Sequence, residues 1–116
     1  MKHRVIIAKM LAHAEKARDY CAALDYAGFA ENDLVTEACV FNLGQIGELA
    51  GNTEEAFRAG HAEIPWRQIR GLRNRIVHDY EGVNRLLIWE IIKDDIPKLI
   101  ADLKALLAEF SDNDTV

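Results

Sequence analysis

The chain has 116 residues, of which 50% are hydrophobic, and it carries a formal net charge of −5. This length predicts one compact domain over residues 1–110 with a polar tail over 111–116, and it excludes a multidomain enzyme. The acidic balance argues against a surface that binds polyanions everywhere. Because the sequence shows no long uncharged apolar run and no cleavable leader, we expect a soluble cytoplasmic protein that does not bind membranes.

The spacing of apolar residues predicts helices throughout the chain and no strands. A first helix is expected over residues 2–24, followed by a segment over residues 25–32 that contains Gly28. Asn32 should cap a second helix over residues 33–50. The glycines inside that helix, Gly44 and Gly47, predict close packing against a neighbour, because each lowers helix propensity by about 1 kcal/mol.

The second half of the chain predicts shorter helices. A third helix should follow the cap residue Thr53 and end at Gly60, and a fourth should run over residues 65–77. Asn84 is expected to cap a last helical segment, which Pro97 must kink or split. These elements predict an all-α fold, a compact antiparallel bundle of about four to five helices.

The two cysteines, Cys21 and Cys39, lie in apolar helical stretches and are not part of a CxxC motif or a Cys/His cluster. We expect both to be buried free thiols, which is typical of a protein from a reducing compartment. Glu-x-x-His pairs, HExxH, GxGxxG and phosphate-loop motifs are absent from the sequence, so no metal and no cofactor is predicted.

One basic segment stands out, because residues 65–78 contain arginines and no acidic residue. Those arginines are Arg67, Arg70, Arg73 and Arg75. Downstream of them, His78 and Tyr80 complete a short run in which a guanidinium, an imidazole and a phenol are close in sequence. Arginine can grip a phosphate through two hydrogen bonds, and histidine transfers protons near neutral pH. This combination suits metal-independent phosphodiester cleavage, in which an RNA 2′-hydroxyl attacks the adjacent phosphorus.

Ideal helix geometry complicates this interpretation. On a continuous helix, Arg73 and His78 would lie about 140° apart, whereas Asn74 and His78 would share a face. Three explanations stay open: the helix deforms near His78, long side chains converge at a groove, or a second subunit completes the site.

The segment over residues 64–80 closely resembles the HepT toxins of the HEPN superfamily. Their signature, Arg-x4-His-x-Tyr with Asn commonly following the Arg, is present as Arg73, Asn74, His78 and Tyr80. The resemblance extends over nearly the whole chain, and further similar stretches are residues 32–35, 46–48 and 89–97.

The resemblance implies a homodimeric, metal-independent RNA endonuclease that is the toxin of a type VII toxin–antitoxin pair. Arg73 and His78 would then form the catalytic pair at the dimer cleft, with Asn74 as polar support. Tyr80 would accept AMP from ATP through a minimal nucleotidyltransferase antitoxin, which silences the nuclease. The remaining arginines would contact either the RNA backbone or the antitoxin, and they are Arg67, Arg70 and Arg75.

Other interpretations stay open for the function. The chain could be a non-catalytic HEPN module that only docks a nucleotidyltransferase, or it could position a substrate for the nucleotidyl transfer of its partner. In the first case the same helical surface would form a tight complex without nuclease activity.

Individual residues also have structural alternatives. Arg73 could form an ion pair with Glu48 or another acidic residue. His78 could cap a helix or lie in the core, and Tyr80 could be an ordinary amphipathic aromatic residue. Two polar residues of the second helix are predicted to be buried and hydrogen-bonded inside the bundle, and they are Asn42 and Glu48. The two tryptophans, Trp66 and Trp89, are expected to anchor the core or a dimer interface.

Overall fold

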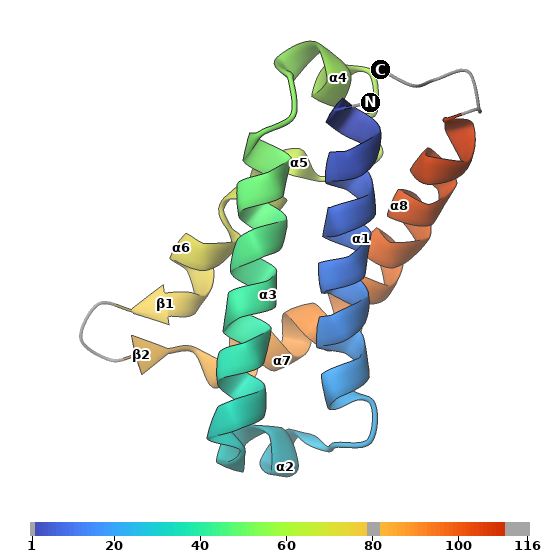
Figure 1. The fold of residues 1–116 in the computed structure, drawn as a ribbon. Helices are drawn as coiled ribbons and strands as arrows, with labels where there is room; N and C mark the ends of the chain where they lie inside the picture. Colours follow the sequence, from blue (N-terminus) through green and yellow to red (C-terminus); the bar gives the residue numbers. More distant parts are fainter. Residues whose placement is uncertain (1, 79–81, 111–116) are drawn as a thin grey trace.

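The computed structural model describes residues 2–78 and 82–110 and confirms the all-α fold class (Figure 1). Its helical elements are α1 (Lys2–Cys21), α2 (Tyr26–Glu31), α3 (Asp33–Gly51), α4 (Glu55–Ala59), α5 (Trp66–Arg70), α6 (Leu72–Ile76), α7 (Arg85–Glu90), the π-helical turn η1 (Ile91–Asp95) and α8 (Ile96–Glu109). Two short strands, β1 (Val77–His78) and β2 (Gly82–Val83), pair between α6 and α7. None of the helices within the described ranges combines the length and the apolarity that a membrane span requires.

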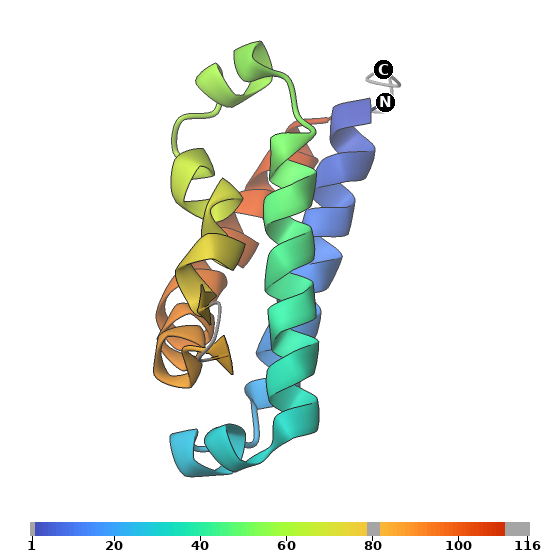
Figure 2. The same ribbon diagram turned by 90° about the vertical axis from the view of Figure 1, so that its left-hand side faces the viewer.

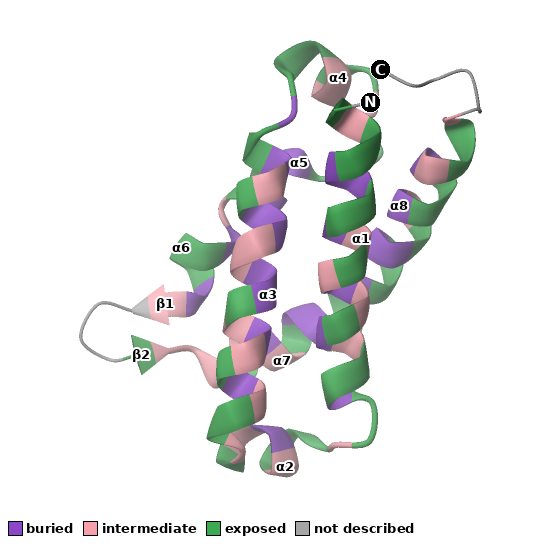
Figure 3. Ribbon diagram, in the orientation of Figure 1, coloured by how far each residue is buried: buried purple, intermediate pink, exposed green. Residues whose placement is uncertain are grey.

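The long helices α1 and α3 lie side by side, and α8 packs against α1 (Figure 1). Buried positions recur along all three helices, as the purple segments show (Figure 3). In α1 the fully buried residues include Met10, Ala14, Ala17 and Cys21, which confirms the apolar stripe that the spacing predicts. The other half of the molecule, with α5 and α6, lies on the side of α3 away from α1 (Figure 2).

The segment after the first helix, for which the sequence predicts no element, forms the short helix α2. The side chain of Asp25 caps α2 by accepting a hydrogen bond of 2.8 Å from the backbone N–H of Gly28, and Phe29 is fully buried. A helix of only six residues shows too little of the helical period to be recognised from apolar spacing.

The bounds predicted for the second helix are confirmed, since Asn32 caps α3 by accepting a hydrogen bond of 3.0 Å from Val35 N–H. The prediction for its two glycines holds at one of them. A Cβ atom on Gly47 would lie 2.8 Å from the carbonyl oxygen of Ile69 in α5, so the absence of a side chain permits this close approach. A Cβ atom on Gly44 would meet nothing within 4 Å, so close packing is wrong there.

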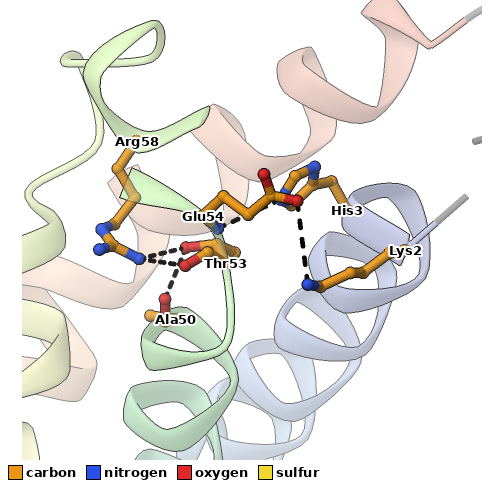
Figure 4. A network of polar contacts seen from close by, with 6 residues as sticks. All are labelled: Lys2, His3, Ala50, Thr53, Glu54 and Arg58. Carbon is orange, nitrogen blue, oxygen red and sulfur yellow. Dashed lines mark hydrogen bonds and ion pairs between the residues drawn. The ribbon is translucent and has the colours of Figure 1, made fainter. Parts of the chain in front are cut away.

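Polar contacts stabilise the connection between α3 and α4 (Figure 4). Thr53 is not the helix cap that the sequence predicts: its hydroxyl donates to the carbonyl of Ala50 at 2.6 Å, and Glu54 takes the cap position. Arg58 donates to the carbonyl of Thr53 and, at 3.0 Å, to its hydroxyl. The N–H of Glu54 donates to His3 Nε2 at 3.2 Å, which joins this turn to the start of α1.

The predicted fourth helix is wrong as a single element, because Gly71 divides it into α5 and α6 and the chain leaves the helix at Val77. Val77 pairs with Val83 and His78 with Gly82, which has the left-handed φ of 82° that favours glycine. The strands are missing from the sequence prediction because two residues cannot show an alternating pattern. His78 therefore lies on a strand, so the angle between Arg73 and His78 on a continuous helix does not apply here, and the three explanations for the motif geometry stay open.

The last helical segment matches its prediction. The side chain of Asn84 caps α7 by accepting a hydrogen bond of 3.0 Å from Leu87 N–H. Pro97 lies in the first turn of α8, directly after the π-helical turn η1. Proline lacks a backbone N–H and clashes with the carbonyl four residues earlier, and the wider turn accommodates this break.

The thiols of Cys21 and Cys39 confirm their prediction, since both are free and fully buried. Their Sγ atoms lie 3.6 Å apart and join the end of α1 to the middle of α3. The hydrogen bond with Cys21, together with burial, raises the pKa of Cys39 far above its ordinary range.

Trp66 is also a core residue, as predicted, and its indole N–H donates to the carbonyl of His61 at 3.0 Å.

Candidate active site

A groove of about 680 Å³ runs between α3 and the segment that carries the motif. The residues of its α3 wall include Glu37, Phe41, Gly44, Gln45 and Glu48. The facing wall includes Arg70 of α5, Arg73 of α6, Val83 of β2 and Arg85 of α7. The groove is therefore lined by one wall from a long rigid helix and one wall from several short elements.

Two of the three glycines of α3, Gly44 and Gly47, shape this space. Gly47 lets α5 approach α3 closely at one point, which brings the arginine-bearing segment against the helix. Gly44 lies on the groove itself, where a side chain would project into open space. Gly47 thus allows the two walls to come into contact, while Gly44 leaves the space between them open.

Arg70 and Arg73 are both exposed and both line the groove. The ion pairs that arginines form within the described residues involve Arg18 and Arg85, and neither Arg70 nor Arg73 takes part in one. The predicted alternative of an Arg73–Glu48 ion pair is therefore wrong, although both side chains line the same groove. Two guanidinium groups remain available there to bind an anion.

Arg85 has a structural role that the sequence did not indicate. Its Nη1 donates to the carbonyl of Ala30 at 3.0 Å and to the hydroxyl of Thr36 at 2.9 Å. Its Nη2 donates to a carboxylate oxygen of Asp33, also at 3.0 Å. Arg85 thus fastens the start of α7 to the junction between α2 and α3, which fixes one end of the groove.

The four arginines that the sequence groups into one basic patch are divided by the fold. Arg70 and Arg73 share the groove, whereas Arg75 lines a separate cavity of about 300 Å³ with Asp94 and other acidic residues. Arg67 is exposed and lines neither space. Arg73 and Arg75 are two residues apart in α6, about 200° around the helix, so they point to different sides.

The remaining motif residues follow Arg73 along the chain. Asn74 is exposed in α6 and is not among the residues that line the groove. The backbone of His78 pairs with Gly82 on β2, next to Val83 of the groove wall. Tyr80 lies outside the described residues.

The two polar residues predicted to be buried in α3 differ. Asn42 is buried, donates to the carbonyl of Ala38 at 2.8 Å and accepts a hydrogen bond of 2.7 Å from His13 Nδ1, so its prediction is confirmed. Glu48 is exposed on the groove, so its prediction is wrong. Phe41 was not singled out from the sequence, yet it is 60% exposed on the same wall. The available signal was an aromatic residue outside the apolar stripe of its helix.

Comparison with known proteins identifies the family. Residues 10–106 match the model of the family described as ribonuclease HepT-like. The chain belongs to this family. A "putative RNase" from Caldanaerobacter subterraneus subsp. tengcongensis is 33% identical over 104 residues, which cover 90% of this chain and 93% of that protein. A "putative RNase" from Methanocaldococcus jannaschii is 32% identical over 90 residues, covering 78% and 83% of the two chains.

A third relative, named "probable ribonuclease HepT", comes from Thermococcus cleftensis. It is 41% identical over 54 residues, which cover 47% of this chain and 49% of that protein. No solved structure matches the chain significantly. Membership of the HepT-like family therefore rests on sequence similarity along most of the chain, which the helical fold accompanies.

Proposed function

We propose that this HepT-like chain is a metal-independent RNA endonuclease and the toxin of a type VII toxin–antitoxin pair. The observation that carries the proposal is the position of Arg73, the motif arginine, which is exposed beside Arg70 in a groove on the surface. Two guanidinium groups that form no ion pair with the described residues share this groove, and they suit a phosphodiester, whose negative charge increases during cleavage. The proposal includes the cytoplasmic location that the sequence predicts, because RNA substrates are present there.

The proposed reaction needs no group from outside the protein and RNA. A general base removes the proton of the 2′-hydroxyl, and the 2′-oxygen forms a bond to the adjacent phosphorus. The bond from phosphorus to the 5′-oxygen breaks, and a general acid protonates that oxygen, which leaves a 2′,3′-cyclic phosphate and a 5′-hydroxyl. In the proposal His78 transfers protons, Arg73 stabilises the charge on the phosphoryl oxygens, and Asn74 provides polar support.

A homodimer is part of the proposal, because the family resemblance assigns Arg73 and His78 to a dimer cleft. Two large apolar side chains support it: Leu34 at the start of α3 is 79% exposed, and Leu86 at the start of α7 is 51% exposed. The contact between Asp33 and Arg85 brings these two helix ends together. Exposed apolar side chains that lie close together are typical of protein interfaces. Sedimentation of the wild type and of Leu34→Asp tests whether this surface joins two copies.

Silencing by AMP transfer is the other part of the proposal. A minimal nucleotidyltransferase antitoxin would use ATP to place AMP on the Tyr80 hydroxyl, and the added phosphate would compete with RNA for the arginines. Intact-mass measurement after co-expression with a cognate nucleotidyltransferase tests this step. We expect an added mass of AMP on the wild type and none on Tyr80→Phe, and an equal shift on both would contradict the role of Tyr80.

The nuclease activity is tested with purified protein and a defined RNA in excess chelator. We expect cleavage by the wild type, products with 2′,3′-cyclic phosphate ends, and no cleavage of the same sequence with 2′-O-methyl groups. His78→Ala should be inactive, whereas Arg4→Ala, which alters an exposed arginine of α1 outside the groove, should retain activity. If the wild type does not cut RNA but binds a nucleotidyltransferase tightly, the chain is a docking module instead.

A further inference from the structure

We propose that the α3 wall of the groove binds a nucleobase on the ring of Phe41, so that the substrate is single-stranded RNA with an unstacked base at the cleavage site. This inference rests on the proposed ribonuclease function. It adds a role for the groove wall that faces Arg70 and Arg73. It assigns a role to Phe41 and to Gly44, neither of which belongs to the Arg-x4-His-x-Tyr motif.

The first observation is the exposure of Phe41. Its ring is 60% exposed although it lines the groove, and leaving a phenyl ring in water is unfavourable by the hydrophobic effect. One contact orients the ring, since the imidazole of His13 lies with its centroid 6.1 Å away at an interplanar angle of 73°. His13 is itself held by its hydrogen bond of 2.7 Å to Asn42. Phe41 is thus a partly supported, uncovered aromatic surface on a rigid helix.

The second observation is the separation of charge across the groove. Arg70 and Arg73 lie on one wall, whereas Glu37 and Glu48 lie on the α3 wall with Phe41. The carboxylates repel a phosphate and the guanidinium groups attract it, so a bound phosphodiester belongs on the arginine wall. The attached base would then face α3, where the carboxylates can accept hydrogen bonds from its amino groups. Charge thus favours a nucleotide bound across the groove and disfavours a backbone that runs along α3.

The third observation is the space that Gly44 leaves. A Cβ atom at this position would have no neighbour within 4 Å, and the residue lies three positions after Phe41 on the same helix face. The groove volume of about 680 Å³ falls within the range of roughly 300–1,000 Å³ that small-molecule sites have. Beside the phenyl ring there is therefore room for a flat base.

The strandedness of the substrate follows from this geometry. Bases in an RNA duplex are paired and stacked, so their faces are not available to an aromatic side chain. Unpaired bases can be splayed out and stacked on phenylalanine, which gives binding without strict sequence preference. We therefore expect the groove to select unpaired RNA segments such as loops and ends.

The test measures binding separately from cleavage. A short single-stranded 2′-O-methyl RNA with a fluorescent label reports affinity by anisotropy, because it lacks the attacking hydroxyl. Phe41→Ala should weaken binding by roughly 5- to 150-fold, the range for loss of one base–aromatic stack, whereas Phe41→Trp should retain affinity. Tyr20→Ala is the matched control, because Tyr20 is an exposed aromatic residue of α1 that does not line the groove.

Gly44 gives an independent variant pair. Gly44→Leu should fill the groove and reduce both affinity and cleavage, whereas Gly44→Ala should affect both much less, since its methyl group projects into open space. Circular dichroism and thermal unfolding establish that each variant is folded. The same RNA annealed to its complement should compete at least tenfold more weakly than the single strand.

The outcomes separate this inference from the ribonuclease proposal. If the wild type cuts RNA and Phe41→Ala binds and cuts equally well, the base site is wrong and the ribonuclease stands. If the wild type binds single-stranded RNA without cutting it, and Phe41→Ala loses binding, the ribonuclease proposal fails and the base site stands. If Phe41→Ala changes the oligomeric state, or if duplex RNA binds as tightly as the single strand, the inference is overturned.

Discussion

The α1–α3 pair and the segment from α5 to β2 differ in how much of their structure is fixed by burial. Helices α1 and α3 are 20 and 19 residues long and face each other through fully buried side chains such as Met10, Cys39 and Leu43. The other segment consists of elements of two or five residues, and its arginines are exposed. The site thus combines a rigid wall with short elements that can present charged groups at several angles, as is common for functional sites on rigid scaffolds.

The largest expected effect on stability tests the rigid wall. Leu43→Ala removes a fully buried side chain from α3 and should lower the free energy of unfolding by about 2–5 kcal/mol, because the neighbours cannot collapse completely into the cavity. Urea denaturation followed by circular dichroism measures the change. Gln68→Ala in α5, where the side chain is exposed, should change stability by less than about 0.5 kcal/mol. Equal losses in the two variants would contradict the comparison.

The largest expected effect on activity tests the second region. Arg73→Ala should lower the rate of RNA cleavage by about 10²- to 10³-fold, the range for loss of one group that stabilises transition-state charge. Its stability should stay near that of the wild type, because the side chain is exposed and makes no ion pair with the described residues. Single-turnover cleavage and thermal unfolding of the same samples measure both. Arg75→Ala is the matched control, since Arg75 lies in the same helix but lines another cavity.

Substitutions at Gly44 and Gly47 test the contact between α3 and the segment from α5 to β2. Gly47→Ala should destabilise the protein by about 1–3 kcal/mol, because the new methyl group would lie 2.8 Å from the carbonyl oxygen of Ile69 and α5 must move. Gly44→Ala should stabilise it by about 0.5–1 kcal/mol, since alanine is the better helix former and nothing obstructs its methyl group. In thermal unfolding, the melting temperatures of the two variants should therefore shift in opposite directions from that of the wild type. Shifts in the same direction would contradict the difference between the two positions.

The difference between the long helices α1 and α3 and the short elements from α5 to β2 also explains how much of this structure the sequence predicts. The cap at Asn32 and the stripe of α1 can be read from the sequence because a long amphipathic helix repeats its pattern several times. The break at Gly71 cannot, since one glycine in a helical pattern lowers propensity by only about 1 kcal/mol and tertiary contacts decide the outcome. The predicted helix therefore continues to Val77, whereas α6 ends at Ile76 and Val77 begins β1.

The candidate site shows a similar limit. Arg73, which the family resemblance assigns to a catalytic cleft, lines the groove, and its catalytic role stays a prediction. Periodicity misplaced Glu48 in the interior, since it lies at the margin of the apolar stripe and its exposure depends on where α5 packs. Phe41 and Arg85 act through neighbours far away in the sequence, and a single sequence does not show such contacts.

Arg85 provides the last and smallest prediction, because it joins the two regions. Its guanidinium bonds to Ala30, Asp33 and Thr36 at distances of 2.9–3.0 Å, so both of its terminal nitrogens are used. Arg85→Ala should lower the free energy of unfolding by about 1–2 kcal/mol, a modest value because the side chain is 35% exposed and water replaces part of the interaction. Thermal unfolding measures this loss.

The control for Arg85 separates charge from geometry. Arg85→Lys keeps the charge but has one terminal nitrogen, so it cannot satisfy both the carbonyl of Ala30 and the carboxylate of Asp33 from the same position. We expect its stability to lie between those of Arg85→Ala and the wild type. If Arg85→Lys equals the wild type, charge alone holds α7 against the α2–α3 junction. If Arg85→Ala is also as stable as the wild type, the groove wall does not depend on this connection.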